Sequence, residues 1–132
     1  MGLDQRVRFA ADRAPAWPAL RDLLASRGLA PQLRMIDGQL AFPDEEPAPD
    51  WQELRVGTAS GMVTLRREPD GMRLVIWGNA DTQTRQAWNA ITWAVAKSSA
   101  GVVEGVSGSC TADEFARTAE LPTGFAADGT GT

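Results

Sequence analysis

The residues with the clearest chemical potential in this sequence are arginines and tryptophans that alternate along predicted strands. Trp51 and Trp77 fall on the same predicted sheet face as Arg55, Arg66 and Arg73. Guanidinium groups interleaved with aromatic rings can stack on bases or hold a carboxylate-bearing partner. The alternative is that another segment covers this face and each arginine stem packs on a tryptophan ring. These five residues form the predicted ligand- or partner-binding site.

A second group of reactive side chains precedes a predicted helix near the C-terminus. Ser107, Ser109 and Cys110 lie at its start, where the helix dipole could stabilise a thiolate. The spacing does not fit a nucleophile elbow, and the sequence contains no histidine. Ser-His-Asp catalysis, Cys-His catalysis and His-ligated zinc are therefore excluded. No catalytic residue is predicted here.

Acidic side chains offer two further kinds of chemistry. Asp44, Glu45, Glu46 and Asp50 carry the oxygen ligands that Ca²⁺ and Mg²⁺ prefer, but they lack the spacing and glycine of a calcium loop. The segment favours a solvated loop, and no metal or cofactor is predicted. A carboxylate-based hydrolase would need two acids, such as Asp44 and Asp81, in one pocket with displaced pKa values. That reading is an alternative function.

Two hairpins should position the arginine and tryptophan face. In residues 33–42, Asp37 and Gly38 form the two-residue signal for a type I′ turn, which places Met35 opposite Leu40 and makes one face apolar. Residues 62–68 and 72–77 flank a second turn whose loop length leaves two registers open. One pairs Leu65 with Leu74 and the other shifts the pairing by one residue; the first is preferred because it gathers the aliphatic side chains on one face.

The remaining elements complete an α+β domain. Apolar spacing predicts helices at residues 15–27 and 82–98, the second capped by Asp81, and a capping box predicts a short helix at 111–119. Residues 7–9, 51–57 and 102–106 are predicted strands. The expected architecture has two layers, with helices on one face of an antiparallel meander sheet of about four to five strands, in the order β-α-β-β-β-β-β-α-β-α. Residues 1–121 form the predicted domain and 122–132 a flexible tail.

The helix at residues 82–98 is apolar on nearly every side. Ala90, Trp93 and Ala94 point outward in the predicted packing, so either the C-terminal segment covers them or a second copy does. The sequence therefore predicts a homodimer with Trp93 near the two-fold axis.

Composition and charge further limit the classes of partner and the cellular compartment that we expect for this protein. The 132 residues have a formal charge of −4 and a pI of about 4.8, which disfavours duplex DNA and anionic membranes as partners. The single cysteine, the absence of an apolar run after Gln5 and the lack of a long apolar stretch favour the cytoplasm. Lys97 is the only lysine among 13 basic residues, which is typical of a GC-rich bacterial genome.

These observations favour a non-catalytic cytoplasmic binding or adaptor module that self-associates. The first alternative is a binder of a small anionic ligand or of single-stranded nucleic acid, which would use the arginine and tryptophan face. The carboxylate hydrolase is the second alternative. No family-level motif decides among these readings.

Overall fold

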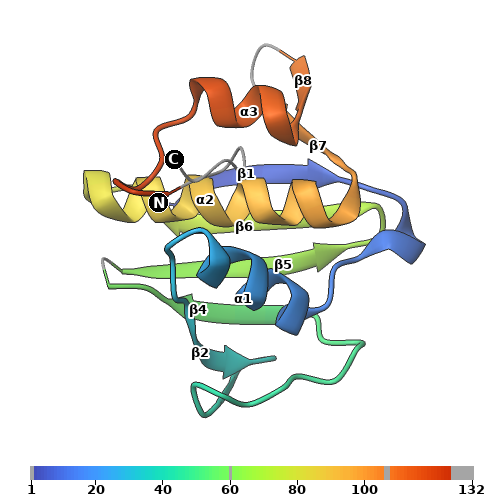
Figure 1. Cartoon of the computed structure of the whole chain (residues 1–132). Helices are drawn as coiled ribbons and strands as arrows, with labels where there is room; N and C mark the ends of the chain where they lie inside the picture. The colour runs from blue at the N-terminus through green and yellow to red at the C-terminus, as the bar shows by residue number, and fades with distance from the viewer. Residues whose placement is uncertain (1, 60, 106–107, 126–132) are drawn as a thin grey trace.

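A computed structural model describes residues 2–59, 61–105 and 108–125. One antiparallel sheet and three α-helices make up the described part of the chain (Figure 1). In chain order, the elements are β1 (Gly2–Arg8), the 3₁₀ turn η1 (Ala11–Arg13), α1 (Trp17–Ser26), β2 (Gln32–Ile36), β3 (Gln39–Leu40), β4 (Glu53–Gly57), β5 (Met62–Glu68), β6 (Gly71–Trp77), α2 (Thr82–Ser99), β7 (Val102–Gly105), β8 (Gly108–Thr111) and α3 (Ala112–Thr118). The predicted α+β class is confirmed.

The sheet is larger than the sequence predicts. Its eight strands follow the order β3-β2-β4-β5-β6-β1-β7-β8, and all neighbouring strands are antiparallel. The expected four to five strands are therefore too few. Strands β2 to β6 form the predicted meander, and β1 lies between β6 and β7. A strand from the start of the chain thus joins the meander to the C-terminal hairpin.

Strand β1 is longer and more central than predicted. The sequence pattern does not indicate its full length, because one of its inward positions is polar. Leu3 and Val7 alternate with Asp4 and Arg6, but Gln5 faces the helices and interrupts the apolar pattern. The amide of Gln5 donates hydrogen bonds to Asn89 and Thr92 of α2, at 3.1 and 3.0 Å. A buried polar group is tolerated when its hydrogen bonds are made.

Both predicted hairpin turns are present. Asp37 and Gly38 have φ values of 49° and 83°, as a type I′ turn requires, and Met35 pairs with Leu40. In the second hairpin Leu65 pairs with Leu74, which confirms the preferred register. The predicted apolar face of the first hairpin is divided, however, because the β2–β4 register shifts between Leu33 and Met35. Leu33 is fully buried, whereas Leu40 on the edge strand β3 is 89% exposed.

The helix ends also follow local sequence signals. Asp81 caps α2 by accepting a hydrogen bond from the Thr84 amide, at 2.8 Å. Thr111 and Glu114 form the reciprocal capping box that begins α3. Gly28, just beyond α1, has a φ of 98°, the left-handed conformation that commonly terminates helices.

All three helices lie on one face of the sheet, with α2 between α1 and α3 (Figure 1). This arrangement buries Ala90, Trp93 and Ala94 completely, so the expectation that they point outward is wrong. Phe125 covers Trp93 edge-on, with ring centroids 5.4 Å apart, and the guanidinium of Arg27 lies 6.0 Å from the same ring. Part of the predicted tail thus packs on the core; residues 126–132 lie outside the described residues.

Candidate binding site on the open face of the sheet

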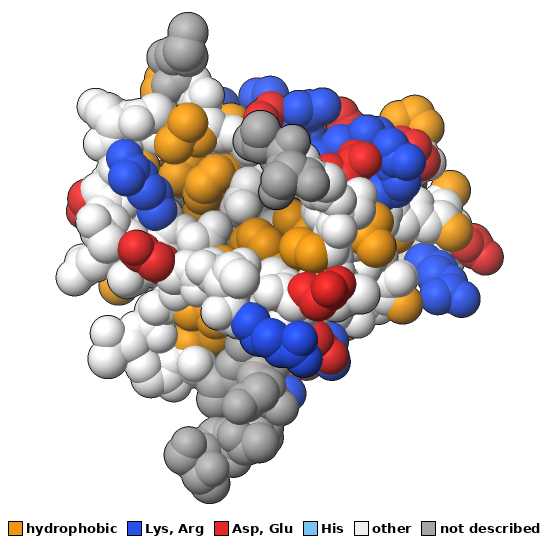
Figure 2. Space-filling model, turned by 90° about the horizontal axis from the view of Figure 1, so that it is seen from above, with side chains coloured by type: hydrophobic (Ala, Val, Ile, Leu, Met, Phe, Trp, Pro, Cys, Tyr) orange, Lys and Arg blue, Asp and Glu red, His pale blue; other side chains and the backbone are white. Residues whose placement is uncertain are grey.

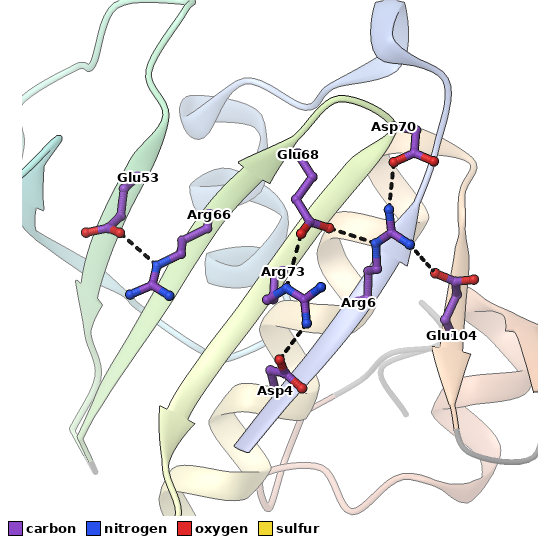
Figure 3. Close-up of polar contacts among 8 residues, drawn as sticks. All are labelled: Asp4, Arg6, Glu53, Arg66, Glu68, Asp70, Arg73 and Glu104. Atoms are coloured by element: carbon purple, nitrogen blue, oxygen red, sulfur yellow. Dashed lines mark hydrogen bonds and ion pairs between the residues drawn. The ribbon is translucent and has the colours of Figure 1, made fainter. Parts of the chain in front are cut away.

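The sheet face opposite the helices, here called the open face, carries a straight row of charged side chains. Strand pairing aligns Glu53 with Arg66, Arg66 with Arg73, Arg73 with Arg6, and Arg6 with Glu104. Their side chains project from five adjacent strands on the side away from the helices (Figure 3). We call these five residues the arginine row. Three arginines on neighbouring strands would repel one another without compensating acids.

Acidic side chains on both sides of the row compensate this repulsion. Glu68 bridges Arg6 at 2.7 Å and Arg73 at 3.1 Å. Asp70 contacts Arg6 and Asp4 contacts Arg73, each at 2.6 Å. The hydrogen bond that Arg6 donates to Glu68, together with the nearby negative charges, raises the pKa of the Arg6 guanidinium. Hydrogen bonds to Asp4 and Glu68 likewise raise the pKa of Arg73. Both arginines therefore remain charged and engaged within the protein.

The remaining ion pairs extend the network across the face. Glu104 accepts from Arg6 at 3.0 Å and from Arg8 at 2.9 Å, and Glu53 pairs with Arg66 at 2.8 Å. Blue and red side chains lie next to one another at the upper right of the view from above (Figure 2). The predicted site residues Arg66 and Arg73 are thus partly neutralised by intramolecular acids. Their first role is to hold the side chains of this face in place.

Next to the arginine row, towards the end of the sheet where β4 leads into β5, the open face changes character. Strand register places Met35 beside Arg55, Arg55 beside Thr64, and Thr64 beside Val75. Large exposed side chains flank these residues. We define the Trp77 patch as this group and its neighbours: Arg34, Met35, Leu40, Arg55, Met62, Thr64, Val75 and Trp77. It combines apolar surface with arginines. The acids at its border, Asp4 beside Val75 and Glu53 two residues before Arg55, are engaged by Arg73 and Arg66 of the arginine row.

Arg34 joins the patch through an irregularity in the sheet. The β2–β4 register shifts between Leu33 and Met35, so Arg34 is the extra residue of a bulge. A Cβ atom added at Gly57 would meet the side chain of Arg34, with Nε at 2.7 Å, so the guanidinium stem lies over the glycine on the open face. Among the described residues, neither Arg34 nor Arg55 has a carboxylate within ion-pair distance. Sequence reasoning missed Arg34 because simple alternation does not predict a bulge.

The two tryptophans of the predicted site separate in the structure. Trp77 is 71% exposed at the end of β6, on the open face as predicted. Trp51 is only 1% exposed, so its prediction as an accessible ligand contact is wrong. Strand β4 begins at Glu53, so the alternation that predicted its orientation does not extend to Trp51. Its ring lies under the guanidinium of Arg67, which faces the helical side, at 4.2 Å from the ring centroid.

The clustering and the pKa values of the acids and the cysteine considered from the sequence bear on possible metal and catalytic sites. Within the described ranges, no group of three or more acidic or cysteine side chains is placed to hold a metal ion. The backbone hydrogen bond from Thr84 lowers the pKa of Asp81, the opposite of the shift a general acid needs. Burial, with a smaller effect of Glu114, raises the pKa of the Cys110 thiol and disfavours the thiolate.

Comparison with known proteins adds no further constraint. No protein-family model matches the chain, and neither a curated protein nor a solved structure matches it. None of the helices in the described ranges combines the length and apolar character needed to cross a membrane. The assignment of a site therefore rests on the geometry of the open face.

The Trp77 patch should have a positive local potential although the chain carries a formal charge of −4. We expect iodide to quench Trp77 fluorescence more strongly than caesium at an ionic strength of about 0.1 M, where charges act over about 10 Å. All five tryptophans lie in the described ranges, and only Trp77 is exposed, so it dominates the quenchable signal. Trp77→Phe should remove that signal. In the double variant Arg34→Glu/Arg55→Glu, caesium should quench more strongly than iodide. Stronger quenching of the wild-type protein by caesium would contradict a positive patch.

Proposed function

We propose that this protein is a binding module that uses the Trp77 patch to recognise an acidic segment of another protein. The observation that carries the proposal is the position of Arg34 and Arg55, which form no ion pair with any described residue, on the same open surface as the exposed ring of Trp77. Aromatic and arginine side chains are enriched among residues that dominate protein interfaces. The patch thus offers apolar contact area and two charge-assisted hydrogen-bond donors together.

The arginine row supports this proposal by fixing the surface around the patch. Acids in the row and on both sides of it engage Arg6, Arg73 and Arg66, so those arginines compensate charge inside the protein. Arg34 and Arg55 lack such acids among the described residues and keep their hydrogen-bonding capacity for a partner. A surface already ordered before binding loses less conformational entropy on association.

The same charges favour a different protein over a second copy of this chain. In a two-fold contact each patch would face its own copy, which places arginines near arginines and supplies no carboxylate. Single-stranded nucleic acid is also disfavoured, because such sites stack successive bases on several aromatic rings and the patch has one. An acidic segment with large apolar side chains satisfies both features of the patch.

The cytoplasm is the compartment we propose for this interaction. Cys110 is the only cysteine, and a reducing environment keeps such a thiol unpaired. No step of the proposed recognition involves bond chemistry, so the proposal is for a binding module and not an enzyme.

Selection from a phage-displayed library of random 12-residue peptides tests the proposal. Wild-type protein should enrich peptides that combine Asp or Glu with Leu, Ile, Phe or Trp. The double variant Arg34→Glu/Arg55→Glu should bind the selected peptides at least about tenfold more weakly, which is about 1.4 kcal/mol. Arg85→Glu/Arg117→Glu is the matched control, because both arginines are exposed on helices in the opposite layer and reversing both makes the same total charge change.

Four outcomes would overturn this assignment. Enrichment of basic peptides, or equal binding by the double variant, would show that the patch does not select acids. Tighter binding of an oligothymidine than of any selected peptide would favour single-stranded nucleic acid. A wild-type dimer in sedimentation that Arg55→Glu dissociates would identify a second copy as the occupant.

A further inference from the structure

A separate hollow lies on the helical side of the sheet, at the end where β5 turns into β6. It has a volume of about 300 Å³, close to the lower limit of small-molecule sites. Its walls are mainly apolar, from Phe9, Ala11, Ala14 and Pro69. Among the described residues Arg67 is its only cationic side chain, and Gln52 adds a polar group. Glu68 also lines the hollow, but its carboxylate is engaged on the open face by Arg6 and Arg73. An apolar hollow with one cation is suited to a small ligand that carries one negative charge.

Arg67 is held rigidly at this hollow. Its guanidinium stacks over the buried ring of Trp51 with 4.2 Å between the Cζ atom and the ring centroid. Nη1 donates a hydrogen bond to the Pro49 carbonyl oxygen at 2.7 Å, and the Arg67 backbone amide donates to the Gln52 carbonyl oxygen at 2.8 Å. A stacked and tethered arginine loses little freedom when it binds a carboxylate.

Arg67 differs from the arginines of the open face because it lacks a direct counter-ion. No carboxylate in the described ranges lies within ion-pair distance of it, and its Nη2 atom donates to no described residue. Burial lowers its pKa, and the more distant charges of Asp50 and Asp37 offset only part of this effect. A partly buried cation without a partner is stabilised when an anion completes the pair.

We infer that this hollow binds a small apolar carboxylate, with its charged group on the Nη atoms of Arg67 and its apolar body against Phe9, Ala11 and Ala14. A neighbouring hollow of about 480 Å³ shares Phe9 and is lined by Arg8, Arg13 and Asp70. Arg8 is already paired with Glu104, so Arg67 is the cation that this inference uses. A dianion such as phosphate fits less well, because the hollow has a single arginine and apolar walls.

The test is a titration of ¹⁵N-labelled protein with sodium benzoate, followed by NMR at the Ala11 and Ala14 amides. Benzoate should shift these signals with saturation at millimolar concentration, and the neutral isostere benzamide should not. Arg67→Gln should weaken binding at least about tenfold. Ala11→Leu should do the same with Arg67 intact, because Ala11 is exposed and a larger side chain there fills the hollow without entering the core.

Arg27→Gln is the matched control, because Arg27 also lies over a tryptophan ring but lines neither hollow. It should bind benzoate as the wild type does, and so should Arg34→Glu/Arg55→Glu, which separates this site from the open face. The inference fails if benzamide binds as tightly as benzoate, or if the wild-type signals do not saturate. It fails equally if folded Ala11→Leu binds benzoate with wild-type affinity.

Discussion

Replacement of Gly71 by alanine should lower the free energy of unfolding by about 3 kcal/mol, at the upper end for overpacking a closed site. An added Cβ would lie much closer to the Val7 carbonyl oxygen than real Cβ atoms approach, and it would also crowd the Arg8 Cα. Both atoms are backbone of β1, which is paired on both sides, so they cannot move as a flexible side chain would. The substitution should loosen β1 where Val7 is fully buried.

Denaturant unfolding followed by tryptophan fluorescence measures this loss. Gly105→Ala in β7 is the control, because a Cβ there makes only an ordinary contact with Gly108, at 3.5 Å, and its stability should change by less than about 0.5 kcal/mol. If the two variants had equal stability, β1 could not be held as closely against β6 as the structure shows. The prediction therefore tests the central position of β1 directly.

Much of the fold could be predicted because its signals are local. The positive φ values of Asp37 and Gly38, the cap at Asp81 and the capping box at Thr111 depend on residues within a few positions of one another. The pairing of Leu65 with Leu74 follows from turn length and apolar alternation. These features need no knowledge of the remainder of the chain.

The features that could not be predicted depend on distant partners. Gln5 occupies an inward-facing strand position, which a polar residue does not indicate from sequence. Its side chain is accommodated there because Asn89 and Thr92 accept its hydrogen bonds. Insertion of β1 between β6 and β7 joins segments separated by most of the chain, and no local pattern encodes that pairing. Strand β8 has no bulky apolar side chain in its sequence, so neither period nor propensity indicated it.

The candidate site also has a part that the sequence predicts and a part that depends on distant residues. Arg55, Arg66, Arg73 and Trp77 were placed correctly on one face, because they lie inside regular strands. The sequence does not predict which arginine is left without an ion pair, because the acids that engage Arg66 and Arg73 come from other strands. The positions of the arginines in the sequence therefore predict which sheet face carries them. The ion pairs in the structure determine which of these arginines remain available to bind a partner.

The two tryptophans most relevant to association should respond to substitution in opposite ways. Trp93→Ala should cost about 3–5 kcal/mol of stability, because the ring is fully buried in the core and its removal leaves a large cavity. Trp77→Ala should change stability by less than about 0.5 kcal/mol, because most of that ring is in water. The sequence alone had assigned the association role to Trp93.

Sedimentation and denaturant unfolding of both variants, with peptide binding for Trp77→Ala, distinguish these roles. Trp93→Phe should recover part of the lost stability, since a ring remains in the cavity to face Phe125 edge-on. Wild-type protein and folded Trp93→Phe should sediment as the same species, because Trp93 is covered by its own chain. If Trp93→Phe instead dissociated a wild-type dimer while keeping full stability, the ring would have to lie at a subunit interface, against the burial seen here. Loss of acidic-peptide binding in Trp77→Ala, with stability unchanged, would place recognition on the exposed ring of the open face, where Arg34 and Arg55 supply the charge.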